Sequence, residues 1–211
     1  SLAQYSNPRS TGIKAIKIEE GDELIDVQVT TGTNDIVLAT RHGLSLRFHE
    51  KDVREMGRDT TGVRGIDLRP RDEVVGMVVV KREATLLVVT EKGLGKCSHI
   101  DDYRVQKRGG KGIMTLNRTE RTGDVVGLME VLPEDEIMLI TKQGVIIRSP
   151  VSQVRVTGRV AQGVKLVQLD EKDLVTAVAR VVPGEKDGDG TEDDTGADEP
   201  IADGTTEDID A

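Results

Sequence analysis

Seven consecutive residues, Gln106 to Gly112, combine three cationic side chains with three glycines. Glycine lets the backbone adopt positive φ and lets a bulky ligand approach closely. Lys107 and Lys111 supply point charges, and Arg108 supplies a planar, bidentate donor. Free amide N–H groups in such a turn can form an anion-binding nest. This chemistry suits an extended polyanion, and nucleic-acid phosphate is the first candidate.

The heptapeptide has two other interpretations. Short basic runs are common on protein surfaces, so a solvated glycine-rich β-turn stays open as an alternative. A mononucleotide P-loop requires Ser or Thr after its lysine. Here Lys111 is followed by Gly112 and Ile113, which excludes that motif.

The heptapeptide belongs to an internal repeat of about 50 residues. Three marks recur with this period. The first is a strand-turn-strand segment with a glycine at Gly43, Gly93 and Gly144. The second is an acidic turn before an apolar pair, at Asp22–Ile25, Asp72–Val75, Gly123–Val126 and Lys172–Val175. The third is a turn that ends in glycine at Gly12, Gly65, Gly112 and Gly163. A period of this length indicates propeller-like or other repeat architecture.

The apolar pattern within each repeat predicts strands. Residues Ile13–Ile18 alternate, as a half-buried strand does, and Val74–Val80 and Leu86–Val89 are short β-branched runs typical of buried strands. Helical character is confined to short stretches near Lys51–Met56 and His99–Tyr103. We therefore predict an all-β fold of units with about four strands, the content of a propeller blade. With one Phe, two Tyr and no Trp, its core must be aliphatic.

Cations recur at matching positions of these units. Aligned on their final glycine, all four turns carry an arginine, and a further cation follows each mid-repeat glycine. The cations outside the heptapeptide that we expect to extend the phosphate track are Arg64, Arg159, Arg47, Lys96 and Arg148. Because equivalent positions of stacked units face the same side, we expect these groups to point outward as a curved belt that tracks phosphates.

These motifs together resemble a known family. Gln106–Gly112 is similar to the gyrase A box, Gln-Arg-Arg-Gly-Gly-Lys-Gly, with Lys107 in place of the first arginine. Glu55–Gly57, Thr60–Ile66 and Gly21–Ile25 also resemble the gyrase A protein of bacterial DNA gyrase. The similarity extends from about Tyr5 to Val182, which is nearly all of the predicted folded part.

The resemblance implies a C-terminal β-pinwheel, a propeller variant with strands exchanged between neighbouring blades. Residues 1–182 would form about three full four-stranded blades plus part of another, the last half of a six-blade domain with its ring incomplete. The family wraps duplex DNA around a basic rim without reading bases, which supports ATP-dependent negative supercoiling by a type II topoisomerase. The implied partners are double-stranded DNA and the remainder of the gyrase A and B proteins, in the bacterial cytoplasm and nucleoid.

The residues expected to bind DNA divide into three roles. Lys107, Arg108 and Lys111 contact phosphate, Gln106 fixes the loop or bonds the DNA backbone, and three glycines set the turn. The complete set is Gln106, Lys107, Arg108, Gly109, Gly110, Lys111, Gly112, Arg47, Lys96, Arg148, Arg64 and Arg159. The family's main box lies in its first blade, whereas this copy lies in the penultimate repeat, so a principal and a secondary role are both open.

Charge separates the body from a tail. Residues 183–211 hold 12 acidic side chains against Lys186, a net charge of −11, whereas the whole chain carries −9 and the rest therefore +2. This composition predicts a disordered acidic tail. The tail either lies on the basic rim and competes with DNA or only aids solubility. Asp187–Gly190 hints at a calcium loop, but Glu192 stands where such a loop requires glycine.

No catalytic or metal site is expected within the fragment, and the resemblance assigns ATP and Mg²⁺ to other domains of the whole enzyme. His42, His49 and His99 are isolated, and Cys97 has no partner cysteine. Neither Tyr5 nor Tyr103 follows an arginine, as the DNA-cleaving tyrosine of type II topoisomerases does. No apolar run approaches the 20 or so residues of a membrane span.

Two alternatives remain. The first is the corresponding C-terminal domain of topoisomerase IV, although domains of that family tend to lack a well-formed box. The second is a propeller-type scaffold that binds another protein. Outward cations in register favour DNA, whereas an exposed apolar patch favours a protein partner.

Overall fold

The computed structural model describes residues 2–81 and 84–181, and this part contains only strands and short 3-10 helices as regular elements. The all-β prediction is confirmed. The helices are η1 (Leu2–Tyr5), η2 (Glu50–Asp52), η3 (Ile100–Asp102) and η4 (Val151–Gln153). The predicted helical stretches thus shrink to η2 and η3, because the backbone returns to an extended conformation at Val53 and Tyr103.

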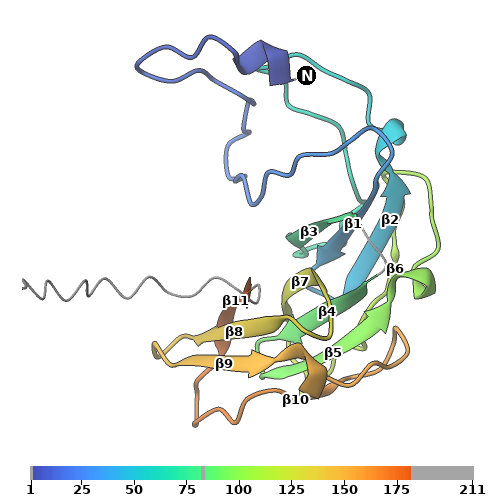
Figure 1. Cartoon of the computed structure of the whole chain (residues 1–211), viewed down its shortest axis with the longest axis vertical. Coiled ribbons are helices and arrows are strands. Elements are labelled where there is room, and N and C mark those ends of the chain that lie inside the picture. The colour runs from blue at the N-terminus through green and yellow to red at the C-terminus, as the bar shows by residue number, and fades with distance from the viewer. Residues whose placement is uncertain (1, 82–83, 182–211) are drawn as a thin grey trace, which may run out of the picture.

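Eleven strands form three antiparallel sheets within the described residues. Sheet A has the order β3-β1-β2-β6, sheet B has β7-β4-β5-β10 and sheet C has β11-β8-β9. The strands are β1 (Asp35–Thr40), β2 (Leu44–His49), β3 (Val74–Val80), β4 (Thr85–Thr90), β5 (Leu94–His99), β6 (Ile113–Met114), β7 (Val125–Val131), β8 (Glu136–Thr141), β9 (Ile146–Pro150), β10 (Val164–Lys165) and β11 (Val175–Val181). Figure 1 shows the sheets following one another along a C-shaped curve, which residues 2–31 extend as a loop without strands.

The fourth strand of a sheet comes from the next repeat. β6 pairs with β2, where Ser45 lies opposite Ile113, and β10 pairs with β5, where Gly95 lies opposite Val164. The chain therefore returns to complete sheet A only after it has built the β4–β5 hairpin of sheet B. This is the strand exchange that the resemblance implied. Sheet C has three strands among the described residues, so two sheets of four strands are complete there.

Sheet B is buried on both faces, which explains its continuous apolar run. Along β4, Leu86 and Val88 pack in a cluster with sheet A, whereas Leu87 and Val89 pack in a cluster with sheet C. Their partners include Val37, Ala39 and Val78 on one side and Ile137, Leu139 and Val151 on the other. Successive strand residues point to opposite faces, so a strand between two sheets needs apolar side chains at every position.

The predicted strand at Ile13–Ile18 is wrong, since these residues have no regular structure. The equivalent segments β6 and β10 are only two residues long and exist by pairing with β2 and β5. No strand of the described residues offers residues 13–18 such an edge. An isolated strand leaves its backbone groups unpaired and therefore has little stability of its own.

Candidate nucleic-acid interface

The heptapeptide forms a tight turn directly before β6. Gly109 and Gly112 have φ of 76° and 73°, where side chains with a Cβ are strained. A Cβ on Gly112 would also lie 2.5 Å from the carbonyl oxygen of Ser45. Only glycine therefore allows this turn to pass so close to β2. Gly110 has no such demand, because a Cβ there would make ordinary contacts.

The structure changes the alignment of the four turns. Gly12, Gly62, Gly112 and Gly163 have φ between 73° and 86°, whereas Gly65 does not have positive φ. The second turn therefore ends at Gly62, three residues before the predicted position. As a result, Arg58, Arg108 and Arg159 share the third place of their turns, and Arg64 is equivalent to Met114.

The third-place arginines bind backbone carbonyls of their own protein. Arg108 donates from Nε to the carbonyl oxygen of Asp52 at 3.0 Å and from Nη1 to that of Arg64. Arg159 donates from Nε to the carbonyl oxygen of Asp102 at 3.1 Å and from Nη1 to that of Met114. Both side chains are half-buried. Two donors of each guanidinium are therefore engaged by backbone carbonyls.

Lys107 and Lys111 differ from Arg108. Both are exposed, and neither makes an ion pair or a side-chain hydrogen bond with residues that the structure describes. Gln106 donates its backbone N–H to the carbonyl oxygen of Arg47 at 2.8 Å. Its side-chain Nε2 is buried without a partner in the described part. The heptapeptide thus presents two free ammonium groups above a turn anchored to β2.

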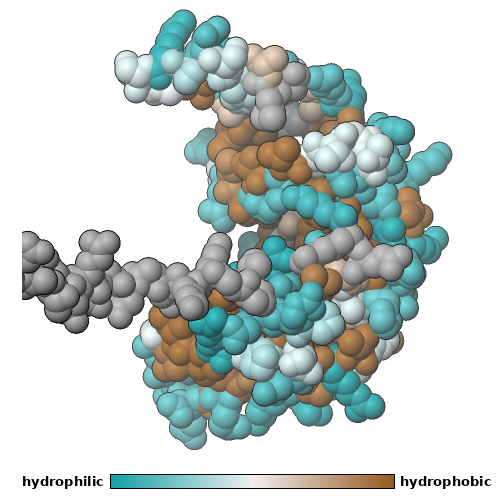
Figure 2. Space-filling model, viewed as in Figure 1, coloured by the Kyte–Doolittle hydropathy of each residue, from teal (hydrophilic) through white to brown (hydrophobic). Residues whose placement is uncertain are grey.

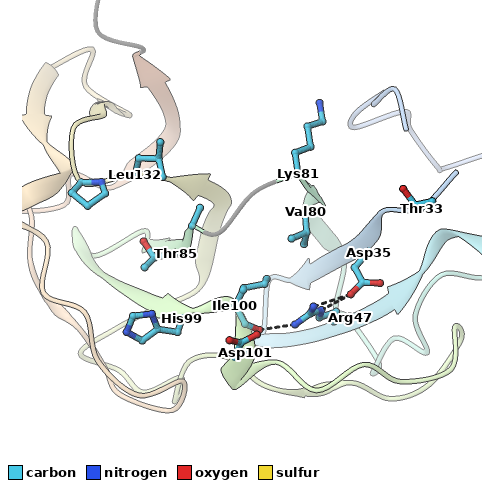
Figure 3. A pocket seen from close by; sticks show the side chains of 12 residues that line it. Thr33, Asp35, Arg47, Val80, Lys81, Thr85, His99, Ile100, Asp101 and Leu132 are labelled. Atoms are coloured by element: carbon cyan, nitrogen blue, oxygen red, sulfur yellow. Dashed lines mark hydrogen bonds and ion pairs between the residues drawn. The ribbon is translucent and has the colours of Figure 1, made fainter. Parts of the chain in front are cut away.

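Arg47 is a structural residue in this conformation. Its guanidinium contacts the Asp35 carboxylate at 2.8 Å and the carbonyl oxygens of Ile100 at 3.0 Å and Tyr103 at 3.2 Å. Figure 3 shows Arg47 turned toward Asp35 and the Ile100 carbonyl, on the wall of an open cavity. Its side chain is 16% exposed. The prediction that Arg47 faces outward in the belt is therefore wrong.

Lys96 is fully buried, so its predicted place on an exposed rim is also wrong. Its Nζ donates to Ser98 Oγ at 2.8 Å and to the carbonyl oxygens of Arg159 at 2.6 Å and Gly158 at 3.3 Å. Burial lowers the pKa of the Lys96 amine from 10.5 to about 8, and the nearby Arg159 charge also acts to lower it. Ladder pairing puts Cys97, one residue later, at the position of Arg47. A one-residue shift along a strand reverses the face, and the equivalent of Lys96 is the core residue Leu46.

The two remaining predicted cations are exposed. Arg148 is about half-exposed and pairs with the Glu136 carboxylate on the neighbouring strand. Arg64 is 72% exposed and lies 3.5 Å from Asp67, a weak contact within one turn of chain. Exposed pairs of this kind contribute little to stability and are readily exchanged for another anion.

Three further cations are in register and were missed. Arg54, Arg104 and Arg155 recur with the spacing of the repeat, and all are exposed without an ion pair to the described residues. Each directly follows the C-cap residue of η2, η3 or η4. Figure 1 shows η2 and η3 on the convex side of the curve. The signal was present in the sequence, as an arginine directly after Val53, Tyr103 and Val154.

Enzyme chemistry has little support in the described residues. Cys97 is buried, and burial raises the pKa of its thiol, which disfavours a nucleophile beside His99. No cluster of three His, Cys, Asp or Glu side chains with metal-binding geometry occurs between residues 2 and 181 outside the gap at 82–83. Within the same ranges no helix has the length and apolarity needed to span a membrane.

Comparison with known proteins agrees with the repeat boundaries. The sequence matches the family described as DNA gyrase C-terminal domain, beta-propeller, over residues 1–31, 34–81, 84–131 and 135–181. The second segment contains β1, β2 and β3 of sheet A. The third contains β4, β5 and β7 of sheet B, together with β6, which completes sheet A.

Curated relatives and solved structures point the same way. The DNA gyrase A protein of Halalkalibacterium halodurans is 54% identical over 180 residues, which cover 85% of this chain and 22% of the relative. The gyrase A protein of Deinococcus deserti is 45% identical over 179 residues, covering 82% and 22%. A solved gyrase A C-terminal domain has a TM-score of 0.76 at 28% identity, covering 82% of this chain and 59% of that one. A topoisomerase IV C-terminal domain has a TM-score of 0.81 at 24% identity, covering 85% and 57%, and supports the fold alone.

The chain spans about a fifth of the length of these curated relatives. The family match nevertheless extends over all four repeats, including residues 1–31, which form no strand here. This chain belongs to the DNA gyrase C-terminal domain family.

Proposed function

We propose that this chain is the DNA-wrapping module of a gyrase A protein, which bends duplex DNA along its convex side through phosphate contacts. The observation that carries the proposal is the recurrence of exposed arginines at Arg54, Arg104 and Arg155, one in each of the last three repeats and none in an ion pair with the described residues. A scatter of surface charges would not keep the period of the fold. Binding of this kind depends on phosphate neutralisation and DNA deformability, not on base contacts.

The contact residues differ from those that the sequence predicted. The proposed contacts are the three recurring arginines together with Lys107, Lys111 and Arg64, whose ion pair with Asp67 is weak. Arg148 can join them by leaving Glu136. The Arg47 side chain binds η3 and its C-cap residue, and the Lys96 side chain binds the turn that contains Arg159. The proposed belt thus keeps Lys107, Lys111, Arg64 and Arg148 of the predicted set, loses Arg47 and Lys96, and gains the three recurring arginines.

Salt dependence of binding tests this proposal. A labelled duplex of arbitrary sequence would be titrated with the chain at several salt concentrations, with affinity followed by fluorescence anisotropy. If roughly six phosphates are neutralised, log K falls against log salt with a slope of about −5. The Lys107→Ala, Lys111→Ala double variant removes two contacts, so its slope is expected to be less steep by about 1.8.

A matched control uses two other exposed lysines. Lys92 and Lys142 lie in the β4–β5 and β8–β9 turns, at the opposite end of the sheets from η3 and η4. The Lys92→Ala, Lys142→Ala variant should keep the original slope. A slope near zero for the unchanged chain contradicts the proposal. An equal loss in both double variants contradicts the assignment of the convex side.

The remaining parts of the function follow from the relatives, which are named as gyrase A proteins. Wrapping would present DNA to a type II topoisomerase for ATP-dependent negative supercoiling in the bacterial cytoplasm, near the nucleoid. The rest of the gyrase A protein and its gyrase B partner would complete that enzyme, with ATP and Mg²⁺ on their domains. Residues 183–211, the predicted acidic tail, lie outside the described residues, and its competition with DNA stays a prediction that deletion of this segment tests.

A second candidate is a scaffold for a protein partner. Val27 and Val29 are 73% and 62% exposed, and Ile146 at the edge of sheet C is 61% exposed. Figure 2 shows apolar surface at the free end of sheet C. An exposed apolar surface favours protein contact. Binding to other gyrase domains that persists at high salt, without DNA affinity, would favour this candidate.

A further inference from the structure

The third-place arginines connect parts of different sheets. Arg159 lies in the turn before β10 of sheet B, and the Asp102 carbonyl that it binds follows β5 of the same sheet. Its second acceptor, the carbonyl oxygen of Met114, belongs to β6 of sheet A. One guanidinium therefore joins sheet B to the exchanged strand of sheet A.

The same contact recurs one repeat earlier. Arg108 binds the carbonyl oxygen of Asp52, which follows β2 of sheet A, and that of Arg64, in the segment after the preceding turn. Arg58 donates to the carbonyl oxygen of Lys14 at 3.3 Å, the next contact of the series. Each acceptor of Nη1 lies 44 or 45 residues before its arginine. Three repetitions indicate a built feature of the fold.

Backbone hydrogen bonds accompany the arginine contacts of Arg58 and Arg108 but not that of Arg159. Gly109 donates to the carbonyl oxygen of Gly65 at 2.7 Å, and Asp67 donates to that of Gly110 at 2.9 Å. Between residues 157–163 and 113–118, both fully described, no backbone hydrogen bond occurs. Among the described residues, the hydrogen bond that joins the turn of sheet B to β6 is therefore the one from Arg159, in addition to the apolar packing between the two sheets.

We infer that Arg159, and to a smaller extent Arg108, is a positioning residue that sets the angle between successive sheets and so the curvature of the bound DNA. This inference rests on the proposed function. The planar guanidinium presents two donors in fixed directions, and a lysine ammonium cannot bridge two carbonyls in the same way. Replacement by lysine therefore keeps the charge and removes the clamp.

The test separates charge from curvature. Arg159→Lys and the matched variant Lys142→Arg each keep the net charge, and both would be studied with a short duplex labelled at its two ends. Arg159→Lys should leave the salt slope of binding unchanged and lower the energy transfer between the ends, because the DNA is bent less. Lys142→Arg, in the β8–β9 turn outside the proposed DNA path, should change neither. An unchanged bend, or a slope that falls by about one as for the loss of a phosphate contact, overturns the inference.

A measurement without DNA keeps the inference independent of the proposed function. Small-angle scattering of the free chain should show a longer maximum dimension or a changed distance distribution for Arg159→Lys, whereas Lys142→Arg should scatter like the original chain. If the unchanged chain does not bind DNA, the proposed function fails, but the scattering comparison still tests the clamp. Identical scattering curves for a folded Arg159→Lys variant and the original chain overturn it.

Discussion

Two turns of this molecule, Gln106–Gly112 and Thr157–Gly163, have the same architecture and different surfaces. Both end in a glycine with positive φ, lead into an exchanged strand and hold an arginine against two carbonyls. The first displays Lys107 and Lys111, whereas the second has Gly158 and Gln162 in their places. The shared features belong to the scaffold, and the differing ones are available for a ligand.

The support beneath the two turns also differs. A Cβ on Gly110 would lie 3.6 Å from the apolar Leu46 side chain, under the first turn. At the equivalent place under the second turn, the Lys96 amine donates to the carbonyl oxygens of Gly158 and Arg159. A strand position that is apolar in one repeat is thus a buried, hydrogen-bonded amine in the next. The comparison separates what every repeat requires from what one repeat has acquired.

The largest effect is expected where the two turns agree. Gly112→Ala and Gly163→Ala should each lower the free energy of unfolding by roughly 2–4 kcal/mol, through backbone strain and overlap with a β-strand carbonyl. Gly12→Ala is the matched control, since Gly12 has φ of 80° but nothing within 4 Å of a Cβ. It should cost roughly 1 kcal/mol. Urea unfolding measures all three, and equal losses would show that close approach to the strand is unimportant.

Lys96 gives an effect of comparable size, which appears only at high pH. Its folded pKa of about 8 lies below the usual 10.5, so between these values the unfolded chain binds more protons than the folded one. The free energy of unfolding of the original chain should therefore rise through this window by about 3 kcal/mol relative to Lys96→Leu. The leucine copies the equivalent Leu46. Thermal unfolding of both proteins from pH 7.5 to 10.5 checks this, and parallel pH profiles would contradict it.

The smallest effect is expected for a double variant that gives the second turn the two lysines of the first. Gly158→Lys with Gln162→Lys copies the surface of the first turn onto the second, where Gly158 does not require positive φ. DNA affinity should rise about tenfold at low salt, with a slope steeper by about 1.8, because two more phosphates are neutralised. Stability should change by less than about 0.5 kcal/mol. An unchanged slope would mean that the second turn lies outside the DNA path.

Much of the fold could be predicted from the sequence. The period of about 50 residues, the hairpin glycines and the β-branched runs follow from local chemistry, and the structure has β3 and β4 where those runs lie. The predicted strand at Ile13–Ile18 failed because its stability depends on an edge supplied from elsewhere. The same pattern forms a strand at β6, since β2 lies beside it. Alternation of apolar and polar residues can be read within one segment, whereas the strand that pairs with that segment is distant in the sequence.

The candidate site was predicted less well than the fold. Lys107 and Lys111 are exposed, as expected for side chains on the glycine-rich turn before β6. The prediction for Lys96 was wrong because Cys97, not Lys96, is equivalent to Arg47. Neighbouring residues of a strand point to opposite faces, so Lys96 points into the core. Arg54, Arg104 and Arg155 recur with the spacing of the repeat. The sequence alignment missed them because it ended the second turn at Gly65, three residues after Gly62, and so shifted that repeat relative to the others.

The sequence by itself determined the repeat, the all-β class, the glycine-ended turns and the family, because these depend on residue types and their spacing along the chain. Only the tertiary structure decided which cations are free. Strand exchange brings the Met114 carbonyl to Arg159 and η3 to Arg47, and these neighbours are distant in sequence. A guanidinium that donates to backbone carbonyls links parts of the fold, and an exposed one without such acceptors stays available for phosphate.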